Sequence, residues 1–259
     1  MKDILNIALI QANLVWENSQ ENLNYFDKKI DKVSSGVDLV VLPEMFTTGF
    51  SMNPEKYAEK MEGETVSWIK KLSKEKEIAI VGSLIIKDDN KYYNRLVFVH
   101  PNGKIDSYDK RHLFTYGGEN KVYSSGNKRL IVEYKGWKIC PMICYDIRFP
   151  VWSRNNDDYE LLIYVANWPK PRISAWDILL KARAIENMCY TIGVNRVGVD
   201  GNNIEHVGHS QVIDMLGKEQ IYNNLEKEVV FEVSLDKNKL TESRNRFRFL
   251  NDKDSFSIE

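Results

Sequence analysis

The stretch Val37-Asp38-Leu39-Val40-Val41-Leu42-Pro43-Glu44 decides the fold of the chain. It is an apolar run that ends abruptly at a proline. Such a run, bounded by a turn, is typical of a strand that is buried on both faces. Before it, apolar residues recur at helical spacing after a cap at Asn18-Ser19, namely at Leu23, Phe26, Ile30 and Val33. An apolar strand over residues 4–14 precedes that helix. The chain therefore starts with a strand, a helix and a strand, the unit of α/β proteins.

The remainder of the chain continues this mixture of strands and helices. A second helix is predicted around residues 66–72 and a third around residues 176–184. Further strands are predicted at residues 78–86, 92–100, 104–108, 130–134, 137–143, 161–166, 190–197, 211–215 and 228–235. Crossovers together with hairpins favour a layered α/β protein with mixed sheets. We expect one domain over residues 1–259, in which residues 248–259 form either a loose tail or an arm on a partner subunit.

Composition and charge exclude several classes of protein. The 259 residues are 43% hydrophobic and 28% charged, so the chain is neither a fibre nor a disordered tail. Its 36 Lys and Arg against 37 Asp and Glu give a net charge of -1, which does not favour nucleic acid as a partner. Three cysteines cannot all pair, and so few in a chain of this length favour a reducing compartment. The N-terminus has no signal-peptide pattern, and no apolar run approaches the roughly 20 residues that span a bilayer. We expect a soluble cytoplasmic protein without a membrane segment.

Three polar residues stand directly after predicted strands, where α/β sheets keep their functional sites. They are Glu44, Lys110 and Cys144. Taken singly, the acid and the lysine fit solvated loops, and the cysteine fits a small buried hydrophobe, as we interpret Cys140 and Cys189. Taken together, they supply what a thiol nucleophile needs, since a carboxylate accepts the thiol proton and a cation stabilises the oxyanion.

Other chemistries have weaker support in the sequence. A Cys-His enzyme stays open, because His112 and His209 lie in segments that could approach Cys144. No H-E-x-x-H, paired C-x-x-C or calcium-loop spacing predicts a metal site. No G-x-G-x-x-G and no P-loop predicts a dinucleotide or ATP site. We therefore expect a reaction that requires neither a metal nor an organic cofactor.

Three segments around these residues resemble, in the same order, the Glu, Lys and Cys motifs of the nitrilase superfamily of carbon-nitrogen hydrolases. They are Leu42-Pro43-Glu44-Met45-Phe46, Tyr108-Asp109-Lys110-Arg111-His112-Leu113-Phe114 and Cys144-Tyr145-Asp146-Ile147-Arg148-Phe149-Pro150. Three further segments most resemble the omega-amidase branch, namely Ala166-Asn167-Trp168-Pro169, Ala182-Arg183-Ala184-Ile185-Glu186-Asn187 and Val194-Asn195-Arg196-Val197-Gly198-Val199-Asp200-Gly201. Together the six segments span most of the chain.

The resemblance implies a four-layer α-β-β-α sandwich with mixed sheets, usually paired through one helical face into a homodimer of eight layers. It also implies that Glu119 is a second glutamate, which positions the lysine and the substrate. From the residues alone, an exposed loop acid beside Gly117-Gly118 is the other interpretation of Glu119. In the mechanism that we expect, Lys110 and the backbone N–H of Tyr145 face the oxyanion.

Omega-amidases act on short 2-oxo acids with a terminal amide, so the resemblance implies a small-molecule substrate such as 2-oxoglutaramate or 2-oxosuccinamate. Such a molecule has a carboxylate that a buried cation could hold, and Arg148 is the candidate because a guanidinium binds a carboxylate bidentately. A structural salt bridge between Arg148 and an acid such as Asp146 is the alternative. A nitrilase, an N-carbamoyl amino acid amidohydrolase and an aliphatic amidase are the alternatives within the superfamily. From another class, a catalytically silent scaffold for protein interaction stays open.

Overall fold

The chain forms two mixed six-stranded sheets in a computed structural model that describes residues 3–221 and 226–258. The strands of the first sheet run in the order β14 (Val229–Asp236), β1 (Ile4–Gln11), β2 (Leu39–Val41), β3 (Ala79–Asp88), β4 (Lys91–Val99) and β5 (Ile105–Asp109). The strands of the second run in the order β13 (Glu219–Ile221), β12 (Gln211–Ile213), β9 (Tyr190–Val194), β8 (Leu161–Val165), β7 (Trp137–Ile143) and β6 (Val132–Tyr134). A separate hairpin pairs β10 (Val197–Val199) with β11 (Glu205–Val207).

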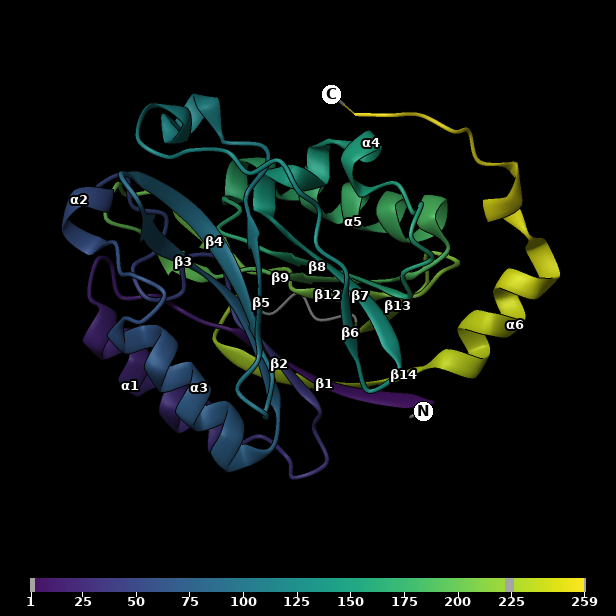
Figure 1. The fold of residues 1–259 in the computed structure, drawn as a ribbon, viewed down its shortest axis with the longest axis horizontal. Helices are drawn as coiled ribbons and strands as arrows, with labels where there is room; N and C mark the ends of the chain where they lie inside the picture. Colours follow the sequence, from purple (N-terminus) through teal and green to yellow (C-terminus); the bar gives the residue numbers. More distant parts are fainter. Residues whose placement is uncertain (1–2, 222–225, 259) are drawn as a thin grey trace.

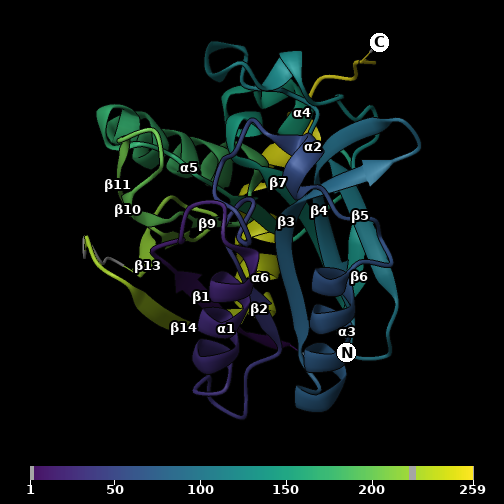
Figure 2. The same ribbon diagram turned by 90° about the vertical axis from the view of Figure 1, so that its left-hand side faces the viewer.

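Helices cover the outer faces of both sheets, which gives the four-layer α-β-β-α sandwich that the resemblance implied (Figures 1 and 2). Helices α1 (Ser19–Ile30) and α3 (Glu64–Lys76) pack on the first sheet, and α5 (Ile173–Asn187) packs on the second. The other helices are α2 (Pro54–Tyr57), α4 (Pro150–Ser153) and α6 (Lys237–Phe247). Short 3-10 turns are η1 (Thr115–Gly117), η2 (Glu119–Lys121), η3 (Cys144–Arg148), η4 (Lys170–Arg172) and η5 (Phe249–Asp252).

Strand β1 shows why the first sheet is covered on both faces. Alternate side chains of a strand point to opposite faces of its sheet. Leu5, Ile7 and Leu9 accordingly pack into the layer between the two sheets, whereas Ala8 and Ile10 pack toward α1 and α3. All five side chains are 0% exposed. A strand buried in this way needs an apolar residue at almost every position, which is why uninterrupted apolar runs predicted these strands.

Helix α5 approaches the second sheet closely at Gly193 of β9. A Cβ atom at this position would lie 2.6 Å from Leu180 Cδ1 and 2.6 Å from Trp176 Cζ2, both on the buried face of α5. Because only glycine leaves room for this contact, α5 lies directly against β9. The close packing also fixes η4, the turn that leads into α5 at the edge of the site described below.

One predicted strand is wrong in its extent. The strand expected over residues 190–197 is divided into β9, which belongs to the second sheet, and β10, which belongs to the separate hairpin. The division lies at Asn195, whose side-chain amide donates to the carbonyl oxygens of Trp168 at 2.9 Å and Gly208 at 2.7 Å. These two bonds hold the backbone in an irregular turn, and the apolar residues on either side do not reveal it.

The polar C-terminal stretch contains helix α6, which the sequence pattern did not predict. Asp236 caps the helix by accepting a hydrogen bond from the N–H of Asn238 at 2.9 Å. Arg244 then attaches α6 to the second sheet, because its guanidinium donates to the carbonyl oxygens of Met188 at 2.8 Å and Tyr159 at 2.6 Å. After η5 the chain continues as the extended segment that runs along the upper edge of Figure 1 toward the label C.

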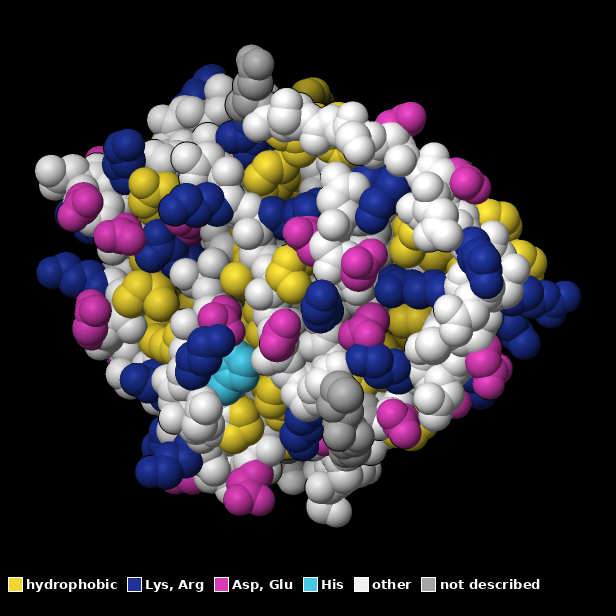
Figure 3. All heavy atoms as spheres, turned by 45° about the vertical axis from the view of Figure 1, so that its right-hand side comes forward, with side chains coloured by type: hydrophobic (Ala, Val, Ile, Leu, Met, Phe, Trp, Pro, Cys, Tyr) yellow, Lys and Arg dark blue, Asp and Glu magenta, His cyan; other side chains and the backbone are white. Residues whose placement is uncertain are grey.

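The surface carries charges of both signs. On the face seen in Figure 3, Lys and Arg side chains lie interspersed with Asp and Glu side chains, which leaves no wide basic patch there. Within residues 3–221 and 226–258, none of the helices combines the length and the hydropathy that crossing a membrane requires.

Candidate active site

The three polar residues that follow predicted strands meet in one cavity. Glu44 follows β2 and Lys110 follows β5, both of the first sheet, whereas Cys144 follows β7 of the second. Cys144 opens η3 with a φ of 43°, a left-handed conformation that is strained for a residue with a side chain. This sharp turn leaves the cysteine at the cavity wall and not within the line of the strand, although it is only 8% exposed.

Lys110 is held between two carboxylates. Its Nζ lies 2.8 Å from Glu44 Oε1 and 2.9 Å from Glu119 Oε2, and all three side chains are 0% exposed. The backbone N–H of Phe114 also donates to Glu119 Oε2, at 2.6 Å. Glu119 is therefore a buried partner of Lys110 and not the exposed loop acid that its neighbouring glycines suggested.

Two asparagines to which sequence reasoning gave no role complete this cluster. Asn94 Nδ2 donates to Glu44 Oε1 at 2.8 Å and to Glu119 Oε1 at 3.1 Å. Asn167 donates its backbone N–H to Glu44 Oε2 at 2.8 Å and its side-chain amide to the backbone oxygen of Glu44 at 2.5 Å. Asn167 lies in one of the segments that resemble omega-amidases, whereas Asn94 lies in the polar first half of β4, next to Arg95, where the sequence gives no signal for it.

Burial and neighbouring charges set the protonation states of the site. Burial alone would lower the pKa of Lys110, but the charges of Glu119 and Glu44 outweigh it and raise that pKa above its ordinary value, so the lysine is cationic. Burial raises the pKa of Glu119, against the opposing charge of Lys110. Burial and then the charge of Glu44 raise the pKa of the Cys144 thiol well above its ordinary value. The thiol is therefore protonated at neutral pH and needs a base to react.

The cavity, about 680 Å³ in volume, also contains two guanidinium groups. Arg148 lies 5.0 Å from the centre of the Trp168 ring, and Arg172 lies 5.1 Å from the centre of the Phe114 ring. Neither guanidinium forms an ion pair within the described part of the chain. Arg148 was expected to be a buried cation, but its side chain is exposed because it rests on an aromatic face at the cavity wall. Sequence reasoning missed Arg172, which stands in a loop with no motif of its own.

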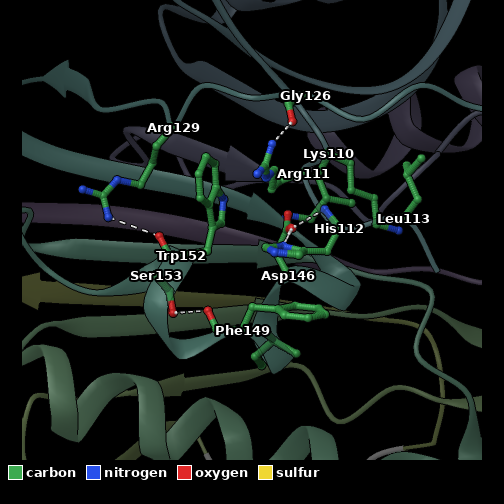
Figure 4. A network of polar contacts seen from close by, with 12 residues as sticks. Lys110, Arg111, His112, Leu113, Gly126, Arg129, Asp146, Phe149, Trp152 and Ser153 are labelled. Atoms are coloured by element: carbon green, nitrogen blue, oxygen red, sulfur yellow. Dashed lines mark hydrogen bonds and ion pairs between the residues drawn. The ribbon is translucent and has the colours of Figure 1, made fainter. Parts of the chain in front are cut away.

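Asp146, two residues after Cys144, holds the loop of the nucleophile in place. Its carboxylate accepts hydrogen bonds from Tyr108 Oη at 2.8 Å and from the backbone N–H groups of His112 at 3.0 Å and Ile143 at 3.1 Å. The ring of His112 also points at Asp146, with Nδ1 2.8 Å from Oδ1 (Figure 4). The alternative in which Arg148 forms a salt bridge with Asp146 is therefore wrong, because other donors occupy this carboxylate.

Neither histidine of the Cys-His alternative is placed to activate Cys144. His112 is held by the contacts just described, and His209 pairs with an aspartate of α5 at 2.9 Å. Neither of them lines the cavity that contains Cys144. The two remaining cysteines, Cys140 and Cys189, are 0% exposed and belong to the hydrophobic core, as predicted.

A four-layer α-β-β-α sandwich with a buried glutamate, a lysine and a cysteine gathered at its strand ends defines the class of carbon-nitrogen hydrolases. Residues 6–245 match the carbon-nitrogen hydrolase family, and the chain belongs to it.

Relatives of known name agree with this family. The chain is 43% identical to omega-amidase YafV of Yersinia enterocolitica over 254 residues, which cover 98% of each chain. It is 36% identical to the 2-oxoglutaramate amidase of Bacillus subtilis over 217 residues, which cover 82% of this chain and 83% of the relative. The fold matches the crystal structure of a CN-hydrolase superfamily protein from Xanthomonas campestris, which has an arsenic adduct in its active site, with a TM-score of 0.97, 42% identity and complete coverage of both chains. The resemblance to the omega-amidase branch is thereby confirmed.

Proposed function

We propose that the protein is an omega-amidase, which hydrolyses the terminal amide of short 2-oxo dicarboxylic acid monoamides such as 2-oxoglutaramate and 2-oxosuccinamate. The observation that carries the proposal is that Cys144, Arg148 and Arg172 line one cavity. A thiol beside a carboxylate base attacks an amide carbon, and a guanidinium binds a carboxylate. Relatives named omega-amidase YafV and 2-oxoglutaramate amidase support the same chemistry.

In the first half of the reaction the enzyme is acylated. Glu44 accepts the thiol proton as Cys144 Sγ attacks the amide carbon. The oxyanion that forms faces Lys110 Nζ and the backbone N–H of Tyr145. Tyr145 is the second residue of η3, and the first N–H groups of a helical turn have no acceptor within that turn. Glu44 then gives its proton to the departing ammonia and leaves a thioester on Cys144.

In the second half, water releases the acid. Glu44 accepts a proton from the water as the water oxygen attacks the thioester carbon. Collapse of this intermediate expels the thiolate of Cys144, which takes the proton back from Glu44 and restores the free enzyme. Glu119 positions Lys110 throughout, and these steps use neither a metal nor an organic cofactor.

Arg148 is our candidate for the carboxylate of the substrate. Its guanidinium lies 5.0 Å from the centre of the Trp168 ring, a cation–π contact, and forms no ion pair within the described residues that would compete for a carboxylate. Arg172, which lies in the same loop as Trp168, is a second cation in this cavity. The acids Glu17 and Asp200 also line the cavity, but each already accepts a hydrogen bond from a neighbouring residue. Arg148 and Arg172, neither of which forms an ion pair within the described residues, are therefore the cations of the cavity that can bind the carboxylate of an anionic substrate.

Ammonia release from 2-oxoglutaramate, glutamine, a nitrile, an N-carbamoyl amino acid and a neutral aliphatic amide, compared side by side, tests the proposal. We expect the highest kcat/KM for 2-oxoglutaramate. A higher value for the nitrile or the carbamoyl compound would replace the proposal by the corresponding alternative, and a higher value for a neutral aliphatic amide would favour an aliphatic amidase. If the folded protein released no ammonia from any of these substrates, the catalytically silent scaffold would be the remaining hypothesis.

The substitution Arg148→Met separates carboxylate binding from support of the nucleophile. A hydrogen bond to a charged group is worth about 1.5 to 3 kcal/mol, so kcat/KM for 2-oxoglutaramate should fall roughly 10-fold or further. Hydrolysis of a small neutral amide should stay nearly unchanged, because that substrate has no carboxylate. The matched variant Arg172→Met shows the same selective loss only if Arg172 is the carboxylate ligand. Equal losses on both substrates would contradict a role of either arginine in specificity.

We further propose that the single domain of residues 1–259 acts in the cytoplasm as a homodimer paired through the face of α5. The exposed apolar side chains Ile178 and Ile185 on this helix support the pairing. Exposed Phe249 and Phe256 support docking of the segment 248–259 on the partner subunit. Sedimentation equilibrium should give twice the mass of the chain, and a chain ending at residue 247 should associate more weakly. A monomer at micromolar concentration would contradict the pairing.

A further inference from the structure

We infer that Asn94 is a positioning residue, which lets Glu44 and Glu119 share one lysine and leaves one lone pair of Glu44 for Cys144. The inference rests on the proposed function, in which Glu44 accepts the proton of Cys144. Asn94 lies within β4, its side chain is 0% exposed, and it belongs to none of the segments that resemble the family.

Two oxygens and two nitrogens meet at the centre of the cluster. Glu44 Oε1 accepts from Lys110 Nζ at 2.8 Å and from Asn94 Nδ2 at 2.8 Å. Glu119 Oε1 accepts from the same two nitrogens, at 3.0 Å and 3.1 Å. One amide and one ammonium thus bridge two buried carboxylates whose charges repel each other. The backbone oxygen of Asn94 also accepts the backbone N–H of Lys110 at 3.0 Å, so Asn94 holds the start of the lysine side chain beside the cluster as well as supplying one of its nitrogens.

The hydrogen bonds to Glu44 determine which of its two oxygens can accept the thiol proton. A carboxylate offers about four lone-pair positions. Lys110 and Asn94 fill the two on Oε1, and the backbone N–H of Asn167 fills one on Oε2 at 2.8 Å. One position on Oε2 remains, and Cys144 lines the same cavity as Glu44 and is exposed to the charge of this carboxylate. Asn94 therefore keeps Oε1 occupied and Oε2 available for the thiol proton.

The charge of the cluster makes this amide necessary. Two carboxylates and one ammonium leave one excess negative charge in a fully buried site. Hydrogen bonds from a neutral donor favour the ionised form of a carboxylate, so removal of Asn94 favours uptake of a proton by the pair. A protonated pair no longer accepts the thiol proton. The other titratable groups that face the pair are Lys110, Cys144 and Tyr123, whose pKa values are all raised, so none of them titrates near neutral pH.

The test measures the rate of Cys144 alkylation by iodoacetamide as a function of pH, which needs no amide substrate. Asn94→Leu removes the donor at similar side-chain size, and Asn94→Asp keeps the shape but adds a third acid. The acid limb of the profile should move to higher pH by about one unit or more in Asn94→Leu, the scale of one hydrogen bond to a charged group. It should move further in Asn94→Asp, because three acids then share one lysine.

Two controls make the outcome decisive. Arg95→Met alters the next residue of β4, whose side chain points to the other face and pairs with Asp109 at 2.6 Å, and it should not shift the limb. Cys144→Ala gives the background from the other cysteines.

With 2-oxoglutaramate, kcat of the Asn94 variants should fall by about tenfold or more with little change in KM. An unshifted acid limb in a folded Asn94 variant overturns the inference, even if kcat falls. Absence of turnover in the parent enzyme would overturn only the proposed function, since alkylation still reports on Asn94.

Discussion

Replacing Lys110 by Met removes the cation that two buried carboxylates share and keeps most of the side-chain volume. Lys110 Nζ lies 2.8 Å from Glu44 Oε1 and 2.9 Å from Glu119 Oε2, and all three side chains are 0% exposed. Truncating one partner of a buried ion pair costs about 3 to 5 kcal/mol, because the remaining charge loses its compensation. The free energy of unfolding at neutral pH should fall by an amount of this size. Lys71→Met, which removes an exposed ion pair with Glu75, is the control and should change it little.

The pH dependence of this loss follows from Glu119. Burial raises the pKa of Glu119 above its ordinary value of 4.5, and the charge of Lys110 opposes the rise. Without Lys110 the pKa of Glu119 in the folded state rises further. A carboxyl group whose pKa is higher in the folded state stabilises the protein below its unfolded pKa, and this stabilisation is lost as the pH rises through the folded pKa. The deficit of the Lys110→Met variant should therefore be largest at neutral pH and shrink as the pH is lowered.

Urea unfolding at a series of pH values measures the deficit, and ammonia release measures the activity of the same variant. Because the loss of one oxyanion donor lowers kcat by about 10² to 10³, kcat/KM should fall at least this far. A deficit that stays constant between neutral and mildly acidic pH would refute the charge argument. A loss of activity of less than about tenfold would show that Lys110 does not face the oxyanion.

Cys144→Ala should abolish turnover with little change in the melting temperature, whereas Cys189→Ala should keep most of the activity because Cys189 only packs in the core; turnover by Cys144→Ala would exclude the thioester. Glu44→Gln should lower kcat more than Glu119→Gln, since Glu44 transfers the protons and Glu119 positions Lys110, and the reverse order in steady-state kinetics would exchange these roles. His112→Ala should keep a larger fraction of kcat than Glu44→Gln, and equal damage would restore the Cys-His alternative.

The strands of the core were predictable because burial on both faces demands uninterrupted apolar residues. The strand expected over residues 137–143 is β7 without a change of bounds, since it is bounded by turns and pairs on both sides with buried neighbours. The break at Asn195 was not predictable, because the acceptors of its amide come from residues 168 and 208. Helix α6 was missed because Leu240 is its one buried residue among those the structure describes, so no apolar period marks it.

The site was predictable to the extent that strand ends reveal it. Glu44 and Cys144 each follow an apolar strand, and Lys110 follows a short strand of mixed polarity, so the position after a strand marks all three in the sequence. Asn94 carries no such mark, because its role depends on which carboxylates lie across the sheet from it. Arg172 reaches the cavity only through the path of a loop, which hydrophobic periodicity does not describe.

The reacting groups belong to different sheets of the sandwich. Glu44 follows β2 of the first sheet, whereas Cys144 and Asn167 follow β7 and β8 of the second, and the bond from the Asn167 N–H to Glu44 Oε2 crosses between them. A small shear of one sheet over the other therefore changes the distance between base and nucleophile while every strand keeps its own hydrogen bonds. The rate of turnover therefore depends on how the two sheets are aligned with each other. Mild denaturant should abolish activity while the circular dichroism spectrum is still that of the folded protein. A large-to-small substitution in the core between the two sheets should have the same effect.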